Sequence, residues 1–351
     1  MNADALRIEL LVASRSHVGH VRGENQDRAL VANFAGEAHG PPWDGTTDVS
    51  EAGALLAVCD GMGGAAGGAV ASTEAVEVLR ARLARPLGTR SDTGSVAARL
   101  VDALRIAART ILDHAKREPA LSGMGTTATV ATLIDRRLLV AQVGDSRAYL
   151  LRQGTLTQLT RDQTLVRFMI ERGQLTEEQA ESFGASNVIL QAVGTSLDLD
   201  VDVRDLELRD GDVLLLCSDG LSGPVGDVRM KALLTEHPDP SAACDALIAA
   251  ALEEGAPDNV TCIVARVRGG NEDVDPADEL PEARRTIFEP EADTLADTIP
   301  PTDPAPRASG PAPDGARRER RSPHRFPRAT RFLCGVVLAA ASFAACAWAL
   351  H

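Results

Sequence analysis

Four aspartates at the ends of apolar segments constrain this chain more than any other feature of its sequence. Asp60 and Asp219 close apolar runs and precede glycine, whereas Asp27 and Asp258 lie in short polar turns. Carboxylates at the ends of buried strands are costly unless something compensates their charge. Hard divalent cations prefer oxygen ligands, and two of them together form a phosphoryl-transfer site. The pattern therefore predicts a fold that gathers these aspartates around bound Mg²⁺ or Mn²⁺.

An Asp-Gly pair taken alone is more often only a turn. The set of four, with Arg22 five residues before Asp27, favours the metal site over four unrelated turns.

Composition narrows the class of protein. A length of 351 residues allows two domains or one large domain with a tail, and an apolar share of 44% is enough for a full core. The net charge of −14 argues against a nucleic-acid-binding domain. None of the six cysteines forms a Cys-x-x-Cys pair, and the N-terminus lacks a basic start followed by an apolar run. We expect a reduced, cytosolic body without a zinc site, a disulfide framework or a signal peptide.

The order of apolar segments predicts two packed sheets flanked by helices, and not a regular βαβ alternation. Predicted helices cover residues 67–85, 96–117, 227–235 and 242–254. Predicted strands cover residues 55–59, 213–218 and 260–267, with an antiparallel meander over 126–134, 138–143, 148–152 and 156–160.

The composition changes near residue 269. Residues 270–331 form a predicted disordered, proline-rich linker, with eleven acids against two arginines over 271–306 and eight arginines against two acids over 307–331. Residues 332–350 carry no charge and are long enough to cross a bilayer. This run predicts a single-pass transmembrane helix, and the arginines that precede it place the part of the chain before the helix in the cytoplasm. The alternative is a buried apolar tail.

Between Ser16 and Val267 the chain resembles the bacterial metal-dependent serine/threonine phosphatases of the PPM class, also called type 2C. Each motif is weak alone, but together and in this order they are specific. They are Arg22-Gly23-Glu24-Asn25-Gln26-Asp27, Asp60-Gly61-Met62-Gly63-Gly64, Gly123-Met124-Gly125-Thr126-Thr127, Gly144-Asp145-Ser146-Arg147, Ser218-Asp219-Gly220 and Asp258-Asn259-Val260-Thr261.

The resemblance implies an α+β fold for residues 1–269, a four-layer α-β-β-α sandwich with the metals in a cleft at one end of the two antiparallel sheets. It implies hydrolysis of phosphoserine and phosphothreonine in proteins, by in-line attack of a hydroxide that bridges two Mn²⁺ or Mg²⁺ ions. The partners would be phosphorylated proteins, and the enzyme would oppose membrane-associated Ser/Thr kinases. A phosphoprotein-binding module of low activity and a small-molecule phosphatase of the same fold are the alternatives.

The resemblance also implies a role for each site residue. Asp60 bridges both ions, the Gly61 carbonyl ligates one, and Asp219 and Asp258 ligate the other. Asp27 lies nearby and acts through bound water.

Arg22 binds the substrate phosphate in the implied site. Asp145 is interpreted as a structural turn acceptor, with a catalytic role as the alternative.

The chain departs from its relatives at three places. Ala120 stands where relatives often hold a third metal with aspartate, and Asp162-Gln163 replaces Asp-His or Asp-Asp. The sequence leaves open whether a third metal site is occupied. Glu118 and Asp162 are the candidates to replace the missing metal ligand. Met62 stands where some relatives have a histidine proposed as general acid. Residues 161–195 resemble a flap beside the cleft, and a rigid insert is the alternative.

Overall fold

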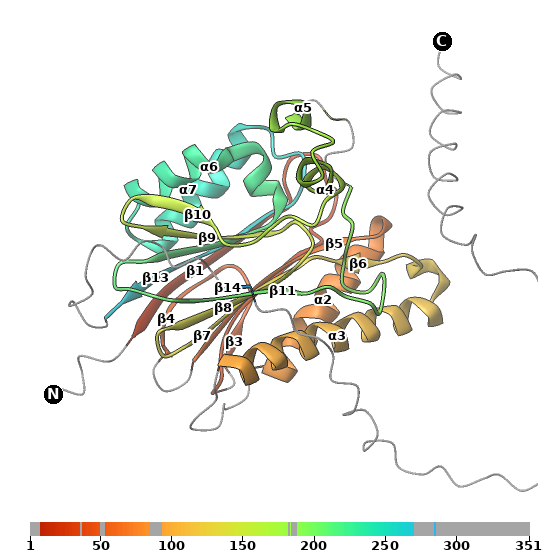
Figure 1. Ribbon diagram of the computed structural model, residues 1–351, viewed down its shortest axis with the longest axis horizontal. Coiled ribbons are helices and arrows are strands. Elements are labelled where there is room, and N and C mark those ends of the chain that lie inside the picture. Colours follow the sequence, from red (N-terminus) through yellow and green to blue (C-terminus); the bar gives the residue numbers. More distant parts are fainter. Residues whose placement is uncertain are drawn as a thin grey trace, which may run out of the picture. The chain divides into compact units, whose positions relative to one another are not determined.

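Two antiparallel sheets lie face to face between two pairs of helices (Figure 1). The computed structural model describes residues 8–35, 37–49, 53–83, 93–181, 183, 188–269 and 284–285. The predicted linker, apart from its residues 284–285, and the predicted membrane helix at 332–350 lie outside this part of the chain. Within it, no helix combines the length and apolar character needed to span a membrane.

The first sheet has six strands in the order β10-β9-β12-β13-β1-β4. In chain order they are β1 (Glu9–His17), β4 (Trp43–Asp48), β9 (Arg147–Arg152), β10 (Thr155–Gln158), β12 (Val213–Cys217) and β13 (Val260–Arg268).

The second sheet runs β14-β11-β8-β7-β5-β2-β3, and a further strand, β6, pairs with β5. These strands are β2 (Asp27–Asn33), β3 (Ala38–His39), β5 (Ala54–Met62), β6 (Gly125–Thr126), β7 (Ala128–Ile134), β8 (Arg137–Val143), β11 (Asp202–Glu207) and β14 (Arg284–Arg285).

Four longer helices cover the outer faces of the sheets. Figure 1 shows α2 (Gly64–Leu83) and α3 (Thr93–Arg117) on one side and α6 (Asp219–Glu236) and α7 (Pro240–Glu253) on the other. A short 3-10 helix, η2 (Pro119–Leu121), follows α3. The α3 side chains that face the sheet recur at three- and four-residue spacing, as in an amphipathic helix. They include Val96, Leu100, Leu104, Ala107 and Ile111.

Each sheet is buried on both faces, and this explains its nearly continuous apolar strands. Along β5, Leu55, Ala57 and Cys59 join the core under α2 and α3. The alternate residues Leu56 and Val58 join the core between the sheets. This is the two-residue period of an extended strand. A third core lies between the first sheet and α6 and α7.

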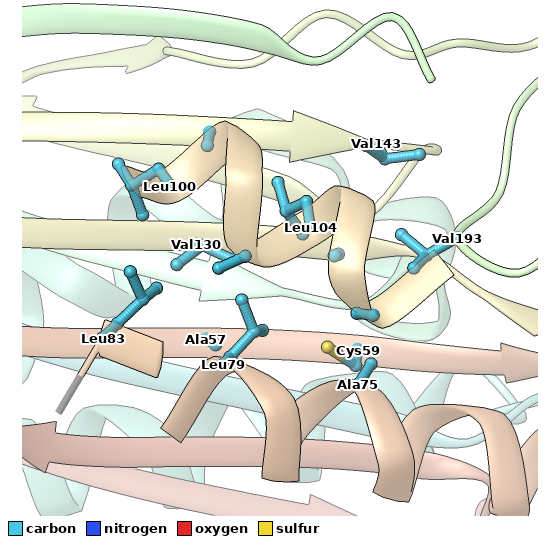
Figure 2. Packing of buried hydrophobic residues seen from close by; sticks show 14 of the residues in the cluster. Ala57, Cys59, Ala75, Leu79, Leu83, Leu100, Leu104, Val130, Val143 and Val193 are labelled. Carbon is cyan, nitrogen blue, oxygen red and sulfur yellow. The ribbon is translucent and has the colours of Figure 1, made fainter. Parts of the chain in front are cut away.

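Figure 2 shows the core under α2 and α3 from nearby. Leu79 and Leu83 of α2 and Leu100 and Leu104 of α3 point toward the buried strand residues, among them Ala57 and Cys59. The predicted helices and buried strands of this part of the chain are therefore confirmed, with ends shifted by a few residues.

The predicted meander is wrong as one unit. β7 and β8 form a hairpin in the second sheet, whereas β9 and β10 form a hairpin in the first. The chain crosses between sheets after Gly144, whose φ of +101° suits glycine. Two hairpins in separate sheets have the same alternation as four strands in one sheet, so the sequence pattern cannot separate the two arrangements.

The sequence analysis missed several strands. The longer ones are β1, β2, β4 and β11, in which polar residues interrupt the apolar pattern, and the two-residue strands β3 and β14 were missed as well. Helix α6 is interrupted at Gly226, whose φ of 70° and ψ of 158° are not helical; the part after this kink matches the predicted helix at 227–235, and the part that begins at Asp219 was missed. The predicted flap contains α4 (Leu165–Glu171) and α5 (Glu177–Glu181).

We predict that Leu104→Ala lowers the free energy of unfolding by about 3 kcal/mol, because it leaves a cavity at a fully buried position. Leu197→Ala is the matched control: this leucine is 51% exposed, and its loss should cost under about 0.5 kcal/mol. Urea unfolding measures both. Equal losses for the two variants would contradict the packing described.

Candidate metal and phosphate site

The four predicted aspartates come from two sheets, two from each, and meet at one end of the sandwich. Asp27 opens β2 and lies directly opposite Asp60 of the neighbouring β5. On the first sheet, Asp219 follows β12 and Asp258 precedes the neighbouring β13. Side chains 27 and 60 continue the rows that face the other sheet, since Val31 and Val58 on the same rows lie in the core between the sheets.

A cleft of about 660 Å³ opens at this end of the sandwich. It is lined by five of the six predicted site residues, Arg22, Asp60, Gly61, Asp219 and Asp258. Asp27, the sixth, is 3% exposed and lies behind the cleft wall. The fold therefore brings the whole predicted set to one place.

Hydrogen bonds hold the backbone of Asp60 from both sides. Its amide donates to the Thr127 hydroxyl at 2.9 Å. Its carbonyl accepts from the Thr126 hydroxyl and the Thr127 amide, each at 2.8 Å. The Thr127 hydroxyl also contacts the Ser146 hydroxyl at 2.7 Å. The two threonines and Ser146 thus fix the backbone position from which the Asp60 side chain extends into the cleft.

Ser218 connects the two sheets beneath the cleft. Its hydroxyl donates to Asp27 Oδ2 at 2.7 Å and accepts from the Thr261 amide at 3.1 Å. Ser218 precedes α6, yet its side chain does not cap the helix. Ser218 therefore links Asp27 of the second sheet to β13 of the first, instead of capping α6.

Burial, with the charges of neighbouring carboxylates, raises the proton affinity of the aspartates. Burial raises the pKa of Asp60 well above its ordinary value, and the charges of Asp27 and Asp219 add to this. Burial likewise raises the pKa of Asp27 to about 6, although its bond from Ser218 opposes the shift. Burial, with the charge of Asp258, raises the pKa of Asp219. The cleft consequently has a field that attracts cations.

The oxygen atoms present suit hard cations. Oδ1 of Asp219 and Oδ1 of Asp145 are buried and have no hydrogen-bond partner. A buried carboxylate oxygen without a partner is costly, and a Mg²⁺ or Mn²⁺ ion supplies what it lacks. Among the described residues, no three Asp, Glu, His or Cys groups lie close enough to enclose one ion by themselves. Such ions keep several water ligands, so the donor set fits cations held partly by water.

Arg22 lies at the mouth of the cleft, with 57% of its side chain exposed. Its Nη2 donates to Asp258 Oδ2 at 2.6 Å. The guanidinium therefore reaches the carboxylates while keeping donors available on its solvent side.

The structure gives a packing reason for Gly61. A Cβ there would lie 2.1 Å from the Gly68 carbonyl oxygen and 2.8 Å from that of Gln26. The sequence analysis gave this residue a role only through its backbone carbonyl, as a ligand of one ion. The contact with α2 and with the loop before β2 already excludes any larger residue.

Asp145 differs from its interpretation as a turn acceptor. It lines the cleft, is 7% exposed, and burial followed by the charge of Asp219 raises its pKa to about 7. Its unpartnered Oδ1 favours the alternative interpretation, a catalytic role.

The two substitutes considered for a third metal have other partners. Arg147 donates to both oxygens of Asp162, at 2.9 Å from Nε and 2.6 Å from Nη2. Glu118 lies 3.5 Å from Nε2 of His114. Neither acid is among the described residues that line the cleft.

Sequence reasoning assigned no role to several residues that build the site. The Thr126-Thr127 pair, Ser218 and Asn259 lie within quoted motifs, and their position beside the aspartates was the available signal. Ile189 also lines the cleft. Nothing in the pattern around it distinguishes it from other flap residues.

We predict that Gly61→Ala weakens Mn²⁺ binding at least about tenfold and lowers the unfolding temperature, since the new Cβ forces β5 away from Gly68. Gly223→Ala is the control, because a Cβ there meets nothing within 4 Å. Calorimetric titration with Mn²⁺ and thermal unfolding of both variants provide the test. Unchanged Mn²⁺ affinity in Gly61→Ala would show that the Asp60 strand tolerates displacement.

Comparisons with known proteins agree with this geometry. The sequence pattern of the family described as protein phosphatase 2C matches residues 43–261. The serine/threonine protein phosphatase PstP of Mycobacterium tuberculosis is 38% identical over 258 residues, which cover 74% of this chain and 45% of PstP. The serine/threonine phosphatase stp of Listeria welshimeri is 32% identical over 260 residues, 71% of this chain and 93% of stp.

Solved structures give the same result. A crystal structure of PstP is similar with a TM-score of 0.63 at 36% identity, covering 74% of this chain and 99% of that one. The catalytic domain of PstP in complex with two manganese ions has a TM-score of 0.62 at 36% identity, with the same coverage. The chain spans less than half of full-length PstP but nearly all of stp. By sequence pattern, identity and fold, the chain belongs to the protein phosphatase 2C family.

Proposed function

We propose that this protein is a metal-dependent phosphatase that removes phosphate from phosphoserine and phosphothreonine in proteins. The observation that carries the proposal is the meeting of Asp60, Asp219 and Asp258 with Arg22 in one cleft. Membership of the family supports it, as do the relatives named serine/threonine phosphatases.

Two Mn²⁺ or Mg²⁺ ions are the proposed cofactors, in line with the two manganese ions of PstP. Asp60 would lie between them, the Gly61 carbonyl would hold one, and Asp219 and Asp258 the other. Asp27, buried behind the cleft, would act through water. Bound there, the ions would lower the pKa of a water molecule and make it a nucleophile at neutral pH.

The protein's own groups position the substrate. Arg22 would direct two guanidinium N–H groups at the phosphate oxygens and offset the charge that develops on them. The threonine bonds to the Asp60 backbone keep that carboxylate in place without reorganisation. Asp145 would orient water in the cleft through its free oxygen. Met62 lines the cleft but has no proton to give.

We predict that the full chain hydrolyses a phosphothreonine peptide with Mn²⁺ and loses this activity in EDTA. Asp60→Ala and Asp258→Ala should each cost at least about a thousandfold in kcat, because each removes a group that holds the ions. Asp113→Ala is the control, an exposed carboxylate on α3. Steady-state kinetics decide: full activity in EDTA refutes the metal mechanism, and a loss below about tenfold refutes the ligand assignment. Phosphopeptide binding without turnover would favour a binding module.

We further propose that the enzyme is attached to the membrane by residues 332–350 and opposes membrane-associated Ser/Thr kinases. Nineteen uncharged residues span roughly 28 Å as a helix, close to the hydrocarbon thickness. The arginines before them would stay on the cytoplasmic face. The four described cysteines are free and buried, in keeping with a reducing compartment.

We expect the full chain to remain with membranes after a carbonate wash, and a chain ending at Arg331 to be released. The physical reason is the apolar segment alone, since both chains keep the arginine cluster. Fractionation followed by immunoblotting measures the distribution. If the carbonate wash also releases the full chain, residues 332–350 do not attach it to the membrane. The proposed opposition to membrane-associated kinases, which rests on that attachment, would then fail too.

A further inference from the structure

We propose that Asn259 is a positioning residue that holds the loop 18–26, and with it Arg22, against the metal side of the cleft. The inference deepens the proposed function and rests on it, because Arg22 is taken to bind the substrate phosphate. Asn259 itself follows Asp258 and precedes β13. It acts on the substrate through the backbone of a distant segment.

The Asn259 side chain ties three backbone groups of the loop. Its Nδ2 donates to the carbonyl oxygens of Val18 and Glu24, each at 2.9 Å. Its Oδ1 accepts from the amide of Gln26 at 2.8 Å. The side chain is 4% exposed, so these bonds are protected from water. One buried amide thus joins the beginning of the loop to its end on either side of Arg22.

The loop needs these bonds because it has no strand or helix of its own. Two contacts beside Asn259 bring the same segments together. The His20 amide donates to the Ala256 carbonyl at 2.9 Å. Gly19 has a φ of +79°, and a Cβ there would lie 2.2 Å from the Asp258 carbonyl oxygen. The loop is therefore in direct contact with the segment that carries Asp258.

An amide is the side chain that this place requires. The two carbonyls need donors and the Gln26 amide needs an acceptor, and Asn supplies both. A carboxylate would face two carbonyl oxygens and add charge beside Asp258. More than half of the Arg22 side chain is exposed, so few packing contacts fix the position of its guanidinium. That position therefore depends on the position of the loop backbone at residue 22. A displacement of about 1 Å lowers the catalytic rate by up to about a hundredfold.

The test compares Asn259→Ala, Arg22→Ala, the double variant and Asn33→Ala in the full chain. Asn33 is the matched control, since its side chain also makes three hydrogen bonds, to Glu37 Oε2 and to the amides of Ala35 and Glu37. The probe is inorganic phosphate, titrated into Mn²⁺-loaded protein by calorimetry. Mn²⁺ affinity and thermal unfolding are measured alongside.

We expect Asn259→Ala to weaken phosphate binding about tenfold to a hundredfold, as Arg22→Ala does, with Mn²⁺ affinity changed less than about threefold. The double variant should be no weaker than Arg22→Ala, because both substitutions remove one interaction. Asn33→Ala should bind phosphate normally. Wild-type phosphate affinity in Asn259→Ala, or losses that multiply in the double variant, would overturn the proposal.

Hydrogen exchange of the wild-type protein gives a second test that needs no substitution. The Gln26 amide should exchange at least about a hundredfold more slowly than in an unstructured peptide, since its acceptor is buried. Exchange at the rate of an unstructured peptide would refute the proposed role of Asn259, even if the Asn259→Ala variant fails to fold. If the wild-type protein does not hydrolyse the phosphopeptide, the proposed function is refuted. Phosphate binding and hydrogen exchange would still test the role of Asn259 in that case.

Discussion

Mutual repulsion of buried carboxylates is the constraint on which the rest of this structure depends. Asp27 and Asp60 lie opposite one another on neighbouring strands, and Asp219 and Asp258 approach from the other sheet. Burial away from water raises the pKa of Asp27 and of Asp60, the charges of the neighbouring carboxylates add to the shift, and both effects oppose folding. Burial of apolar side chains in the three cores supplies the favourable free energy of folding that offsets this cost.

The polar residues around the cleft have one common task, to hold the segments that carry the site residues in place. Thr126 and Thr127 hold Asp60, Ser218 links Asp27 to β13, and Asn259 holds the Arg22 loop. Each is buried, so each bond is worth more than it would be in water. Preorganisation of this kind lets a site stabilise charge without rearranging at the moment of reaction.

Much of the fold could be predicted from the sequence, and the failures have physical causes. The α3 residues Leu100 and Leu104 predicted a buried helix face because helical spacing is local. The division of 126–160 between two sheets was missed because strand pairing is decided by distant segments. The strand β11, with its charged residues, gave too weak a local signal.

The sequence by itself determined the chemistry available: which carboxylates and which arginine could serve, and the order in which the chain presents them. Only the tertiary structure decided that Asp145 lines the cleft, that Asp162 is bound by Arg147, and that Asn259 holds the loop of Arg22. These outcomes depend on contacts between residues that lie far apart along the chain. Sheet register and loop packing set such contacts, whereas periodicity and composition report only on neighbours.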